Sequence, residues 1–397
     1  MKRAGIAAIF VFSVLQPCMS IADQDLPCLK SITPTDSLLI ADSKGQILYK
    51  KNERKKLIPA STLKILTALT ALDHFGVSYR FKSEFYLDAD RNLKVKGYGD
   101  PLLISEVCRE IAKEVAEKVR DFNDLILDDA YFERGIVVPG RKHSTNPYDA
   151  PLGALCANFN TVYFSRDQEG RLISAEPQTP LIPFAREKIR KIGQKRGRYI
   201  LSHDSGDITH YSGRLLLYFL RGSGAHCHGK VTIGRVRPED RLIYTHHSRF
   251  DLETVLKKMM EFSSNFMANQ VFVALGAHVY GPPGTMAKGV KVVSSYAKKR
   301  LGLDDIEIKE GSGISRRNHL SAFDMLVILR HFAPYRHILK SKGVLTFKTG
   351  SLRGIRTRAG YIKVSSKQPY CFVIFLNRPG PDIEALMDCV KDAFADP

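Results

Sequence analysis

The stretch PASTLKILTALTAL, from Pro59 to Leu72, predicts a helix that carries a serine and a lysine near its start. Its leucines recur at helical spacing, at positions 63, 66, 69 and 72. Pro59 and Ser61 mark the start of this helix, and Gly76 supplies its end. Ser61 and Lys64 are therefore expected one turn apart on the same helix face.

This serine and lysine could form a nucleophile and its base. A serine hydroxyl needs a base to become nucleophilic, and a lysine one turn away can serve if burial or a nearby cation lowers its pKa. At a helix start the amide dipoles favour a developing anion, and the serine N–H can help to form an oxyanion hole. The pair alone is weak evidence, because Ser61 could be an N-cap and Lys64 a solvated lysine.

Two further motifs change the interpretation of this pair. Ser263 to Asn265 give a Ser-x-Asn pattern in a segment that reads as helical, and Lys348 to Gly350 give Lys-Thr-Gly in LTFKTGSLRG, Leu345 to Gly354. Lysine and glycine both weaken a strand interior, and a hairpin turn is the plain alternative for the last motif. The order Ser-x-x-Lys, Ser-x-Asn, Lys-Thr-Gly is typical of the penicilloyl-serine enzymes, so the three together favour that chemistry.

The order of the expected elements predicts one α/β domain that is split in the sequence. Two strands precede the helix at Pro59, further helices are expected after Asp251, and three strands with a last helix close the chain. Residues 87–242 read instead as short strands, turns and basic loops, with a short helix near Glu106 to Arg120. We therefore expect an α/β (α+β) fold, with an antiparallel sheet flanked by helices in 23–86 and 243–397 and a largely β accessory region inserted at 87–242.

The N-terminus reads as a secretory signal that is removed, residues 1–22. Two basic residues precede an apolar run, Ala4 to Leu15, that is too short to span a bilayer, and Ser20 to Ala22 offer a small-x-small cleavage site. A lipoprotein anchored at Cys18 is the alternative, which Pro17 disfavours. No later segment is long and apolar enough to span a membrane. A periplasmic location is the expectation.

The formal net charge of +19 indicates an anionic partner. Cell-wall polymer, lipid headgroups and nucleic acid all fit the charge, but no zinc-finger spacing or aromatic-interleaved RNA-binding pattern is present. Export argues further against nucleic acid. We therefore expect no nucleic-acid partner, and a basic surface that could hold the protein peripherally at membrane or wall.

Six cysteines remain once the signal is removed: Cys28, Cys108, Cys156, Cys227, Cys371 and Cys389. An oxidising compartment would permit disulfides, but the sequence does not choose among the pairings. The wide spacing gives no metal knuckle and no CxxC pair. GAHCHGK around Cys227 is expected to be an exposed loop, since no further ligands stand at the usual spacing. We expect no metal and no cofactor.

The three motifs and several longer blocks resemble the D-alanyl-D-alanine carboxypeptidase/endopeptidases, the low-molecular-mass class C penicillin-binding proteins. The blocks are GYGDPLL (97–103), LILDDAYF (125–132), PLGALCANFNTVYF (151–164), EGSGISRRNHLS (310–321) and KTGSLRGIRTRAGYI (348–362). The likeness covers nearly the whole mature chain. In this family one or two accessory domains separate the first two motifs, which accounts for the long gap between Ser61 and Ser263. The family has a DD-peptidase/β-lactamase-like transpeptidase domain.

The resemblance implies a reaction on the D-Ala-D-X bonds of peptidoglycan stem peptides, with β-lactams as covalent inhibitors. Ser61 would attack the scissile carbonyl with Lys64 as base, and the acyl-enzyme would then be hydrolysed. Ser263 would relay a proton to the leaving amine, and Asn265 would hold the substrate amide. The N–H groups of Ser61 and Ser351 would form the oxyanion hole.

The resemblance also implies substrate-binding residues. Lys348 would provide positive potential, Thr349 would bind the terminal carboxylate, and Gly350 would let an extended substrate approach the strand edge. Asp128 could meet the free ammonium of a diaminopimelate side chain, and Arg316 its carboxylate. Asp128 could equally be a turn acid, and Arg316 a surface arginine.

Some positions depart from the family pattern. Glu310 occupies a position where an aspartate is usual. The last catalytic strand carries three positive charges, those of Arg353, Arg356 and Arg358. These residues leave the substrate preference open. A serine β-lactamase is the nearest enzymatic alternative, although no added glutamate base for deacylation can be assigned. A wall-binding scaffold that kept the fold is the alternative from another class.

Overall fold

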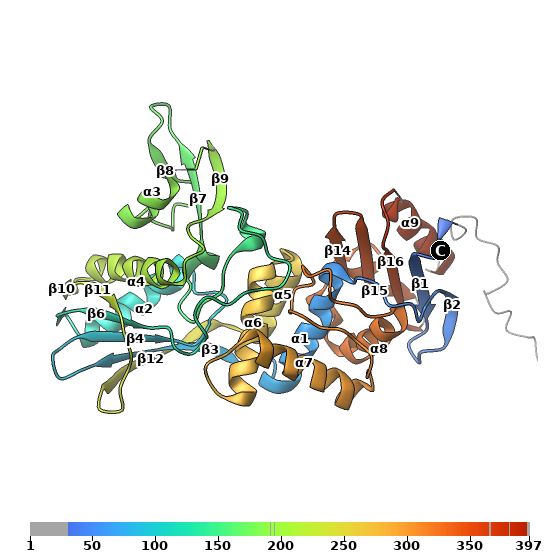
Figure 1. The fold of residues 1–397 in the computed structure, drawn as a ribbon, viewed down its shortest axis with the longest axis horizontal. Helices are drawn as coiled ribbons and strands as arrows, with labels where there is room; N and C mark the ends of the chain where they lie inside the picture. The colour runs from blue at the N-terminus through green and yellow to red at the C-terminus, as the bar shows by residue number, and fades with distance from the viewer. Residues whose placement is uncertain (1–30, 191, 194, 365–366, 381, 395–397) are drawn as a thin grey trace, which may run out of the picture.

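The computed structural model describes residues 31–190, 192–193, 195–364, 367–380 and 382–394. The predicted signal segment, the alternative anchor Cys18 and Cys28 all lie outside these described residues. Two lobes follow one another along the long axis of the molecule (Figure 1). We call residues 31–79 and 252–394 the split lobe, and residues 80–251 the inserted lobe.

A six-stranded sheet joins the two ends of the chain in the split lobe. Its order is β13-β14-β15-β16-β1-β2, and every neighbouring pair is antiparallel. The strands are β1 (Asp36–Ala41), β2 (Ile47–Lys51), β13 (Lys340–Lys342), β14 (Leu345–Leu352), β15 (Ile355–Val364) and β16 (Lys367–Leu376). Because β1 pairs with β16, the N-terminal and C-terminal segments form one body.

Alternate side chains of this sheet enter two different cores, as the period of a strand requires. Leu38 and Ile40 pack with α9 (Ile383–Phe394) on one face. Leu39 and Ala41 pack on the other face against a helical layer. That layer consists of α1 (Lys64–Phe75), α5 (Leu252–Glu261), α6 (Asn265–Tyr280), α7 (Met286–Leu301) and α8 (Ala322–Phe332). The helices predicted from sequence in this lobe are present, except that the helical segment expected from Asp251 is two helices, α5 and α6, with a break at residues 262–264.

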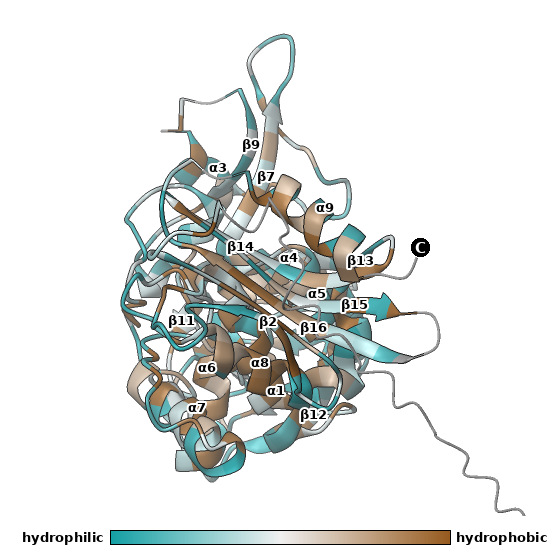
Figure 2. Ribbon diagram, turned by 90° about the vertical axis from the view of Figure 1, so that its right-hand side faces the viewer, coloured by the Kyte–Doolittle hydropathy of each residue, from teal (hydrophilic) through white to brown (hydrophobic). Residues whose placement is uncertain are grey.

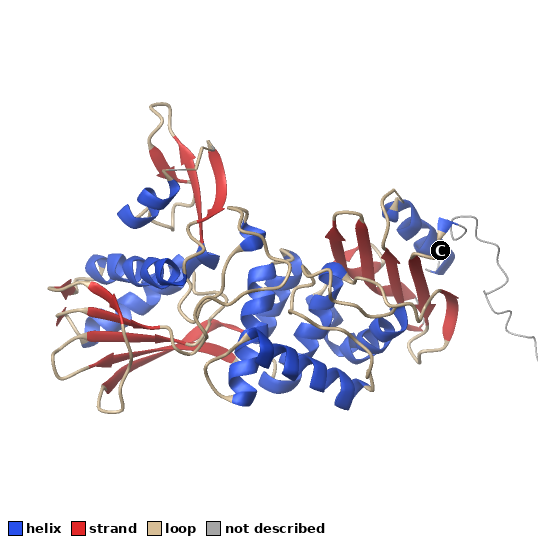
Figure 3. Ribbon diagram, in the orientation of Figure 1, coloured by secondary structure: helices blue, strands red, loops and turns tan. Residues whose placement is uncertain are grey.

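The helical layer lies between the two large sheets of the molecule (Figure 3). Apolar residues are concentrated on α1, α6 and α8 within it (Figure 2). α6 is buried on nearly every side, because its sequence is apolar all round. These packed helices fix the positions of the motifs that stand at the starts of α1 and α6.

A second, five-stranded sheet forms the centre of the inserted lobe. Its order is β11-β6-β4-β3-β12, with β3 antiparallel to both neighbours and β6 parallel to both. The strands are β3 (Arg80–Leu87), β4 (Leu93–Gly97), β6 (Leu125–Asp128), β11 (Val231–Ile233) and β12 (Arg241–Asp251). Helices α2 (Ser105–Lys118) and α4 (Ser205–Gly222) pack on this sheet (Figure 1). The predicted boundaries at 86/87 and 242/243 fall inside β3 and β12.

Two smaller sheets complete the inserted lobe. β7 (Thr161–Arg166), β8 (Leu172–Ser174) and β9 (Arg196–Ile200) form a three-stranded sheet beside α3 (Pro183–Ile189), which projects from the lobe in Figure 1. β5 (Asp121–Phe122) pairs with β10 (His226–Cys227). The expectation of an exposed loop around Cys227 was wrong, because Cys227 lies in the short β10 and is half-buried, with its Sγ 3.2 Å from the Asn123 carbonyl oxygen.

The inserted lobe is built largely from short strands and loops, and α2 is the short helix expected near Glu106 to Arg120, but α3 and α4 add helices that the sequence analysis did not predict. α4 in particular was not predicted from its sequence, SGDITHYSGRLLLYFLRG. Glycines and β-branched or aromatic residues give this segment weak helix propensity. The helix forms because the Asp204 side chain caps it at the Asp207 N–H and because its apolar face is buried.

In the described part of the chain, no helix has both the length and the apolar character needed to cross a membrane.

Cys389 is disulfide-bonded. Cys108, Cys156, Cys227 and Cys371 are free thiols.

Candidate active site

Four segments that are distant in the sequence meet at the edge of the split-lobe sheet. They are the short 3₁₀ helix η3 (Ala60–Leu63) that leads into α1, the start of α6, the loop 310–318, and β14. Ser61, Lys64, Asn265 and Lys348, all predicted from the motifs, lie on or beside these segments. The site is therefore assembled by tertiary packing rather than by any one motif.

Ser61 stands in η3 directly after a residue with unusual backbone geometry. Ala60 has φ +47°, a left-handed conformation that side chains other than glycine rarely adopt. The Pro59 carbonyl just before it accepts two hydrogen bonds of 2.7 Å, from the hydroxyls of Thr62 and Thr357. These bonds hold the turn in place, and such strain is commonly found where a reactive group is presented.

Lys64 is fully buried, and neutral oxygens surround its amine. Its Nζ lies 2.9 Å from Ser61 Oγ, 2.9 Å from Asn265 Oδ1 and 2.8 Å from the Ser312 carbonyl oxygen. A neutral amine has two N–H groups and one lone pair. Asn265 and Ser312 can accept the two hydrogens, which leaves the lone pair directed at the Ser61 hydroxyl. This arrangement suits a base that takes the proton of Ser61.

The electrostatic surroundings favour that neutral form. Burial lowers the pKa of Lys64 well below its usual value, and the positive charge of Lys348 lowers it further. The carboxylate of Glu310 acts in the opposite direction and limits the fall. A lysine of depressed pKa can act as the base that makes the neighbouring serine nucleophilic, as the sequence motif predicts.

Glu310 organises the loop that supplies the Ser312 carbonyl. Its side chain is buried and accepts hydrogen bonds from six donors around the loop. The donors are Asn269 Nδ2 (3.0 Å), Ser312 N (2.7 Å), Ser312 Oγ (2.6 Å), Gly313 N (2.7 Å), Ser315 N (3.3 Å) and Asn318 Nδ2 (2.7 Å). One carboxylate thus fixes the backbone that holds Lys64.

Gly313 lets this loop pass close to the nucleophile turn. Its φ is +83°, and a Cβ at this position would lie 1.8 Å from the Ala60 carbonyl oxygen. No larger residue fits without moving the backbone beside Ser61.

The Ser-x-Asn motif stands at the beginning of α6. Ser264 caps the helix by accepting a 3.2 Å hydrogen bond from the Met267 N–H, and Ser263 before it has φ +51°. Asn265 points into the site, with Oδ1 toward Lys64 and Nδ2 3.4 Å from the Tyr148 carbonyl oxygen of the inserted lobe. Ser263 is half-buried, and its hydroxyl has no hydrogen-bond partner among the described residues. The structure brings Asn265 to Lys64, whereas Ser263 lies beside the site without contacting either group.

β14 carries the Lys-Thr-Gly motif on a strand, which confirms that element and excludes a hairpin turn there. β13 covers only residues 345–347 of β14, so among the described strands the edge from Lys348 onward is unpaired. Lys348 is buried and its Nζ donates to the Thr349 carbonyl oxygen at 2.8 Å. Thr349 and Ser351 are exposed. The strand therefore offers free backbone groups and a cation to an extended ligand.

Burial lowers the pKa of Lys348 to about 8, and the nearby charge of Arg358 contributes to the shift. Arg358 itself is directed away from the open edge, because its guanidinium forms a 2.6 Å ion pair with Glu384 of α9. Of the three arginines that load this strand region, only Arg353 and Arg356 are exposed.

Gly350 explains why the motif ends in glycine. A Cβ at this position would lie 2.2 Å from Thr357 Oγ1 and 2.9 Å from the Ser61 backbone nitrogen. Only glycine allows β14 to pass so close to the nucleophile turn.

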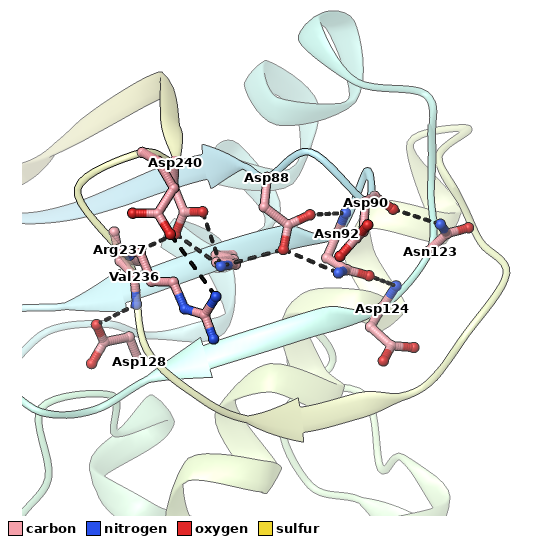
Figure 4. Close-up of polar contacts among 11 residues, drawn as sticks. Asp88, Asp90, Asn92, Asn123, Asp124, Asp128, Val236, Arg237 and Asp240 are labelled. Atoms are coloured by element: carbon pink, nitrogen blue, oxygen red, sulfur yellow. Dashed lines mark hydrogen bonds and ion pairs between the residues drawn. The ribbon is translucent and has the colours of Figure 1, made fainter.

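The structure separates the two predicted stem-peptide residues. Arg316 is exposed and donates to the Arg353 carbonyl oxygen, at the end of β14. Asp128 ends β6 in the inserted lobe, where its carboxylate accepts from Val236 N at 2.9 Å (Figure 4). It also accepts from Ala130 N at 3.0 Å. Arg235 lies 3.4 Å from the same carboxylate. Arg316 thus lies near the catalytic strand, whereas Asp128 is engaged within its own lobe.

Sequence reasoning missed three contributors to this site. Glu310 was noted in the sequence only as a departure from the family pattern. No neighbouring residue indicated that its carboxylate accepts six hydrogen bonds. Thr357 and the Tyr148 carbonyl could not be found, because their contacts arise from strand pairing and from packing between the lobes. Among the described residues, no group of three or more His, Cys, Asp or Glu side chains could hold a metal ion.

Two known carboxypeptidases are similar to this chain in sequence. The D-alanyl-D-alanine carboxypeptidase DacB of Haemophilus influenzae is 24% identical over 404 residues, covering 84% of this chain and 83% of that protein. The D-alanyl-D-alanine carboxypeptidase of Actinomadura sp. (strain R39) is 23% identical over 441 residues, covering 90% and 80%.

The crystal structure of penicillin binding protein 4 (dacB) from Haemophilus influenzae matches with a TM-score of 0.77 at 20% identity, covering 93% of this chain and 98% of that one. A structure of the same protein complexed with a β-lactam matches with a TM-score of 0.70. Residues 37–195 and 191–339 match the D-Ala-D-Ala carboxypeptidase 3 (S13) family. Since that match spans most of the chain, this protein belongs to the D-Ala-D-Ala carboxypeptidase 3 (S13) family and is a peptidase of the serine type.

Proposed function

We propose that this protein hydrolyses D-Ala-D-X bonds of peptidoglycan stem peptides through an acyl-Ser61 intermediate. The observation that carries the proposal is the contact between Lys64 Nζ and Ser61 Oγ at 2.9 Å. The amine is buried among neutral oxygens, so it can accept the hydroxyl proton as Ser61 attacks. A structural lysine would instead be paired with a carboxylate or reach solvent.

The acylation step follows from this geometry. Ser61 Oγ attacks the carbonyl carbon of the penultimate D-alanine while its proton passes to Lys64. The N–H groups of Ser61 and Ser351 stabilise the oxyanion. The proton then reaches the leaving amine, with Ser263 as the relay. Water hydrolyses the resulting ester and regenerates the Ser61 hydroxyl.

The leaving amine decides between the two activities. Release of a free D-amino acid is carboxypeptidase action, and release of a cross-linked side-chain amine is endopeptidase action. Both reactions break the same bond type and need the same groups, so we propose both for this site.

We propose that the substrate lies along the unpaired edge of β14. An extended stem peptide would pair with the backbone there, and Lys348 would attract its terminal carboxylate while Thr349 binds it. Asn265 would hold the substrate amide. Arg316 lies close enough to that strand end to meet a second carboxylate of the stem.

Three further proposals concern the protein as a whole. The pairing of β3 and β12 supports an inserted accessory domain at residues 80–251, wider than the sequence predicted. We propose a periplasmic location after removal of residues 1–22, because the proposed substrate is there. The net charge supports peripheral association with membrane or wall.

The test is an intact-mass time course of the mature protein with benzylpenicillin, beside a Ser61→Ala control. A lasting adduct on the wild type alone supports a peptidase that deacylates slowly. An adduct that disappears as the drug is consumed would favour the β-lactamase alternative. If neither adduct nor consumption occurs, the catalytic role of Ser61 is wrong and the scaffold alternative gains. Cleavage of a pentapeptide stem and of a cross-linked dimer then separates carboxypeptidase from endopeptidase action.

A further inference from the structure

A groove of 1090 Å³ lies in the inserted lobe, between α2, α3, α4 and the start of β11. This volume is slightly above the usual range of small-molecule binding sites, about 300 to 1,000 Å³. None of its lining residues belongs to the catalytic site. α3 and α4 stand in the lobe that points away from the six-stranded sheet (Figure 1).

Five exposed basic side chains line this groove: Arg109, Lys113, Arg214, Arg221 and Lys230. They come from α2, α4 and the residue before β11, and the helical spacing of each pair places both members on one face. The described residues that line the groove include no acidic side chain. Among the described residues none of the five forms an ion pair, although many other basic residues in the protein do.

Aromatic rings hold two of these cations over the groove wall. The guanidinium of Arg214 lies 4.9 Å from the Phe184 ring centroid, and that of Arg109 lies 5.3 Å from the Phe219 ring centroid. Such contacts orient the guanidinium groups without neutralising them. The groove thus carries five positive charges without an ion-pair partner among the described residues, and aromatic rings orient two of them.

The rest of the lining is apolar. Ile182, Phe184, Leu217 and Phe219 form its floor, and Tyr218 is 52% exposed at the side. A small hydrophilic anion would use the charges and leave the apolar floor and Tyr218 uncovered. A ligand with an anionic head and an apolar tail would use both, and tyrosine is a common residue at the interface between water and lipid.

We propose that this groove is a binding site for the phosphate headgroup of an anionic lipid, with the basic cluster on the phosphate and the apolar floor against the acyl chain. The site is independent of Ser61. Lipid binding in this groove would hold the protein at a membrane surface. The basic residues that contact the membrane would then be those of the groove.

The experiment measures partition of the mature protein to phosphatidylcholine vesicles with and without phosphatidylglycerol. Each basic residue close to an anionic surface adds about fivefold to affinity. The Arg109→Gln/Arg214→Gln/Arg221→Gln variant should therefore bind the anionic vesicles about 100-fold more weakly. A control, Lys257→Gln/Lys291→Gln/Lys299→Gln, removes the same charge from exposed positions on α5 and α7. It should stay within about twofold of the wild type.

Two further arms identify the ligand. Tyr218→Ser should weaken vesicle binding about fivefold and leave titration with inorganic phosphate unchanged, because it removes only an apolar contact. Equal losses in both triple variants would overturn the proposal in favour of net charge alone. Equal binding to vesicles without phosphatidylglycerol would also overturn it. If inorganic phosphate binds the groove but Tyr218→Ser binds the anionic vesicles as tightly as the wild type, the groove is a phosphate site and not a lipid site.

Lipid binding in the groove and catalysis at Ser61 are tested independently of each other. Ser61→Ala should bind vesicles as the wild type does, and the groove variant should react with benzylpenicillin at the wild-type rate. Wild-type behaviour in these two controls also shows that both variants are folded.

Discussion

Two buried lysines, one in each lobe, face opposite surroundings. Lys64 in the split lobe is fully buried and contacts three neutral oxygens. Lys94 on β4 of the inserted lobe is 4% exposed and contacts two carboxylates. Its Nζ lies 2.9 Å from Asp240 and 3.3 Å from Asp88. The two aspartates approach β4 from the same side (Figure 4).

The same burial therefore has opposite consequences. For both lysines, removal from water by itself lowers the pKa. At Lys94 the hydrogen bonds and charges of Asp240 and Asp88 outweigh burial and raise the pKa. At Lys64 a second cation, Lys348, adds to the effect of burial. Burial alone therefore does not identify a catalytic lysine; at Lys64 burial is combined with neutral hydrogen-bond partners and a contact with the Ser61 hydroxyl.

Lys64→Met should abolish formation of the acyl-enzyme. The side chain has similar length but no basic amine, so Ser61 loses its base. We expect the rate of acylation by benzylpenicillin to fall about 10³-fold or more. Intact-mass kinetics measure this rate, and circular dichroism checks that the variant is folded. Acylation within tenfold of the wild type would show that another group activates Ser61.

Lys94→Met should destabilise the protein and leave the chemistry intact. Asp240 and Asp88 would remain in the lobe without their cation, which costs about 3–5 kcal/mol when a buried pair is broken. Urea unfolding measures the loss, and the acylation rate per folded molecule should match the wild type. The double variant Lys94→Met/Asp240→Asn should recover part of the stability, because it removes one of the unpaired charges.

Glu310→Gln should slow acylation by about 10- to 100-fold. An amide offers N–H groups where the loop needs acceptors, so at least one donor at Ser312 or Gly313 loses its partner and the Ser312 carbonyl shifts away from Lys64. The change also removes the charge that raises the pKa of Lys64. The acid limb of the acylation profile should therefore move to lower pH. Glu310→Asp keeps the charge and should retain more activity, and loss of rate without that movement of the limb would contradict the electrostatic role.

The local part of this arrangement could be predicted from the sequence. Leucine spacing, Pro59 and Gly76 located the helix that carries Lys64, and Lys-Thr-Gly fell on a strand as expected. These signals lie within a few residues of one another, so short-range rules apply. Helix α4 was missed because burial, not propensity, determines it.

Long-range contacts account for what the sequence could not provide. The role of Glu310 depends on Asn269 and on the loop that folds around it. The hydrogen-bond partners of Asp128 depend on how residues 235–240 pack against the end of β6 (Figure 4). These partners lie far apart in the sequence, and no local sequence pattern indicates that they are in contact.

The pH dependence of kcat/KM should separate Lys348 from Lys64. Lys348, with a pKa of about 8, is positive below that pH and neutral above it. Attraction of the substrate carboxylate should be lost as pH rises, so kcat/KM should fall on an alkaline limb near pH 8, tenfold per pH unit at most. Lys348→Arg keeps its charge and should lack this limb. A limb that persists in the arginine variant would have to come from another group.

Asp128→Asn should have the smallest effect. An asparagine can still accept one of the hydrogen bonds from Val236 or Ala130, and the cost in stability should be about 1 kcal/mol. If the carboxylate stays engaged in the inserted lobe, the ratio of kcat/KM for stem peptides with a free or an acetylated third-residue amine should change less than about twofold. Arg316→Gln, at the end of β14, is the matched comparison for the stem carboxylate. A tenfold loss of preference for the free amine in Asp128→Asn would mean that Asp128 leaves Val236 to bind substrate, and that the two lobes share the recognition of the stem.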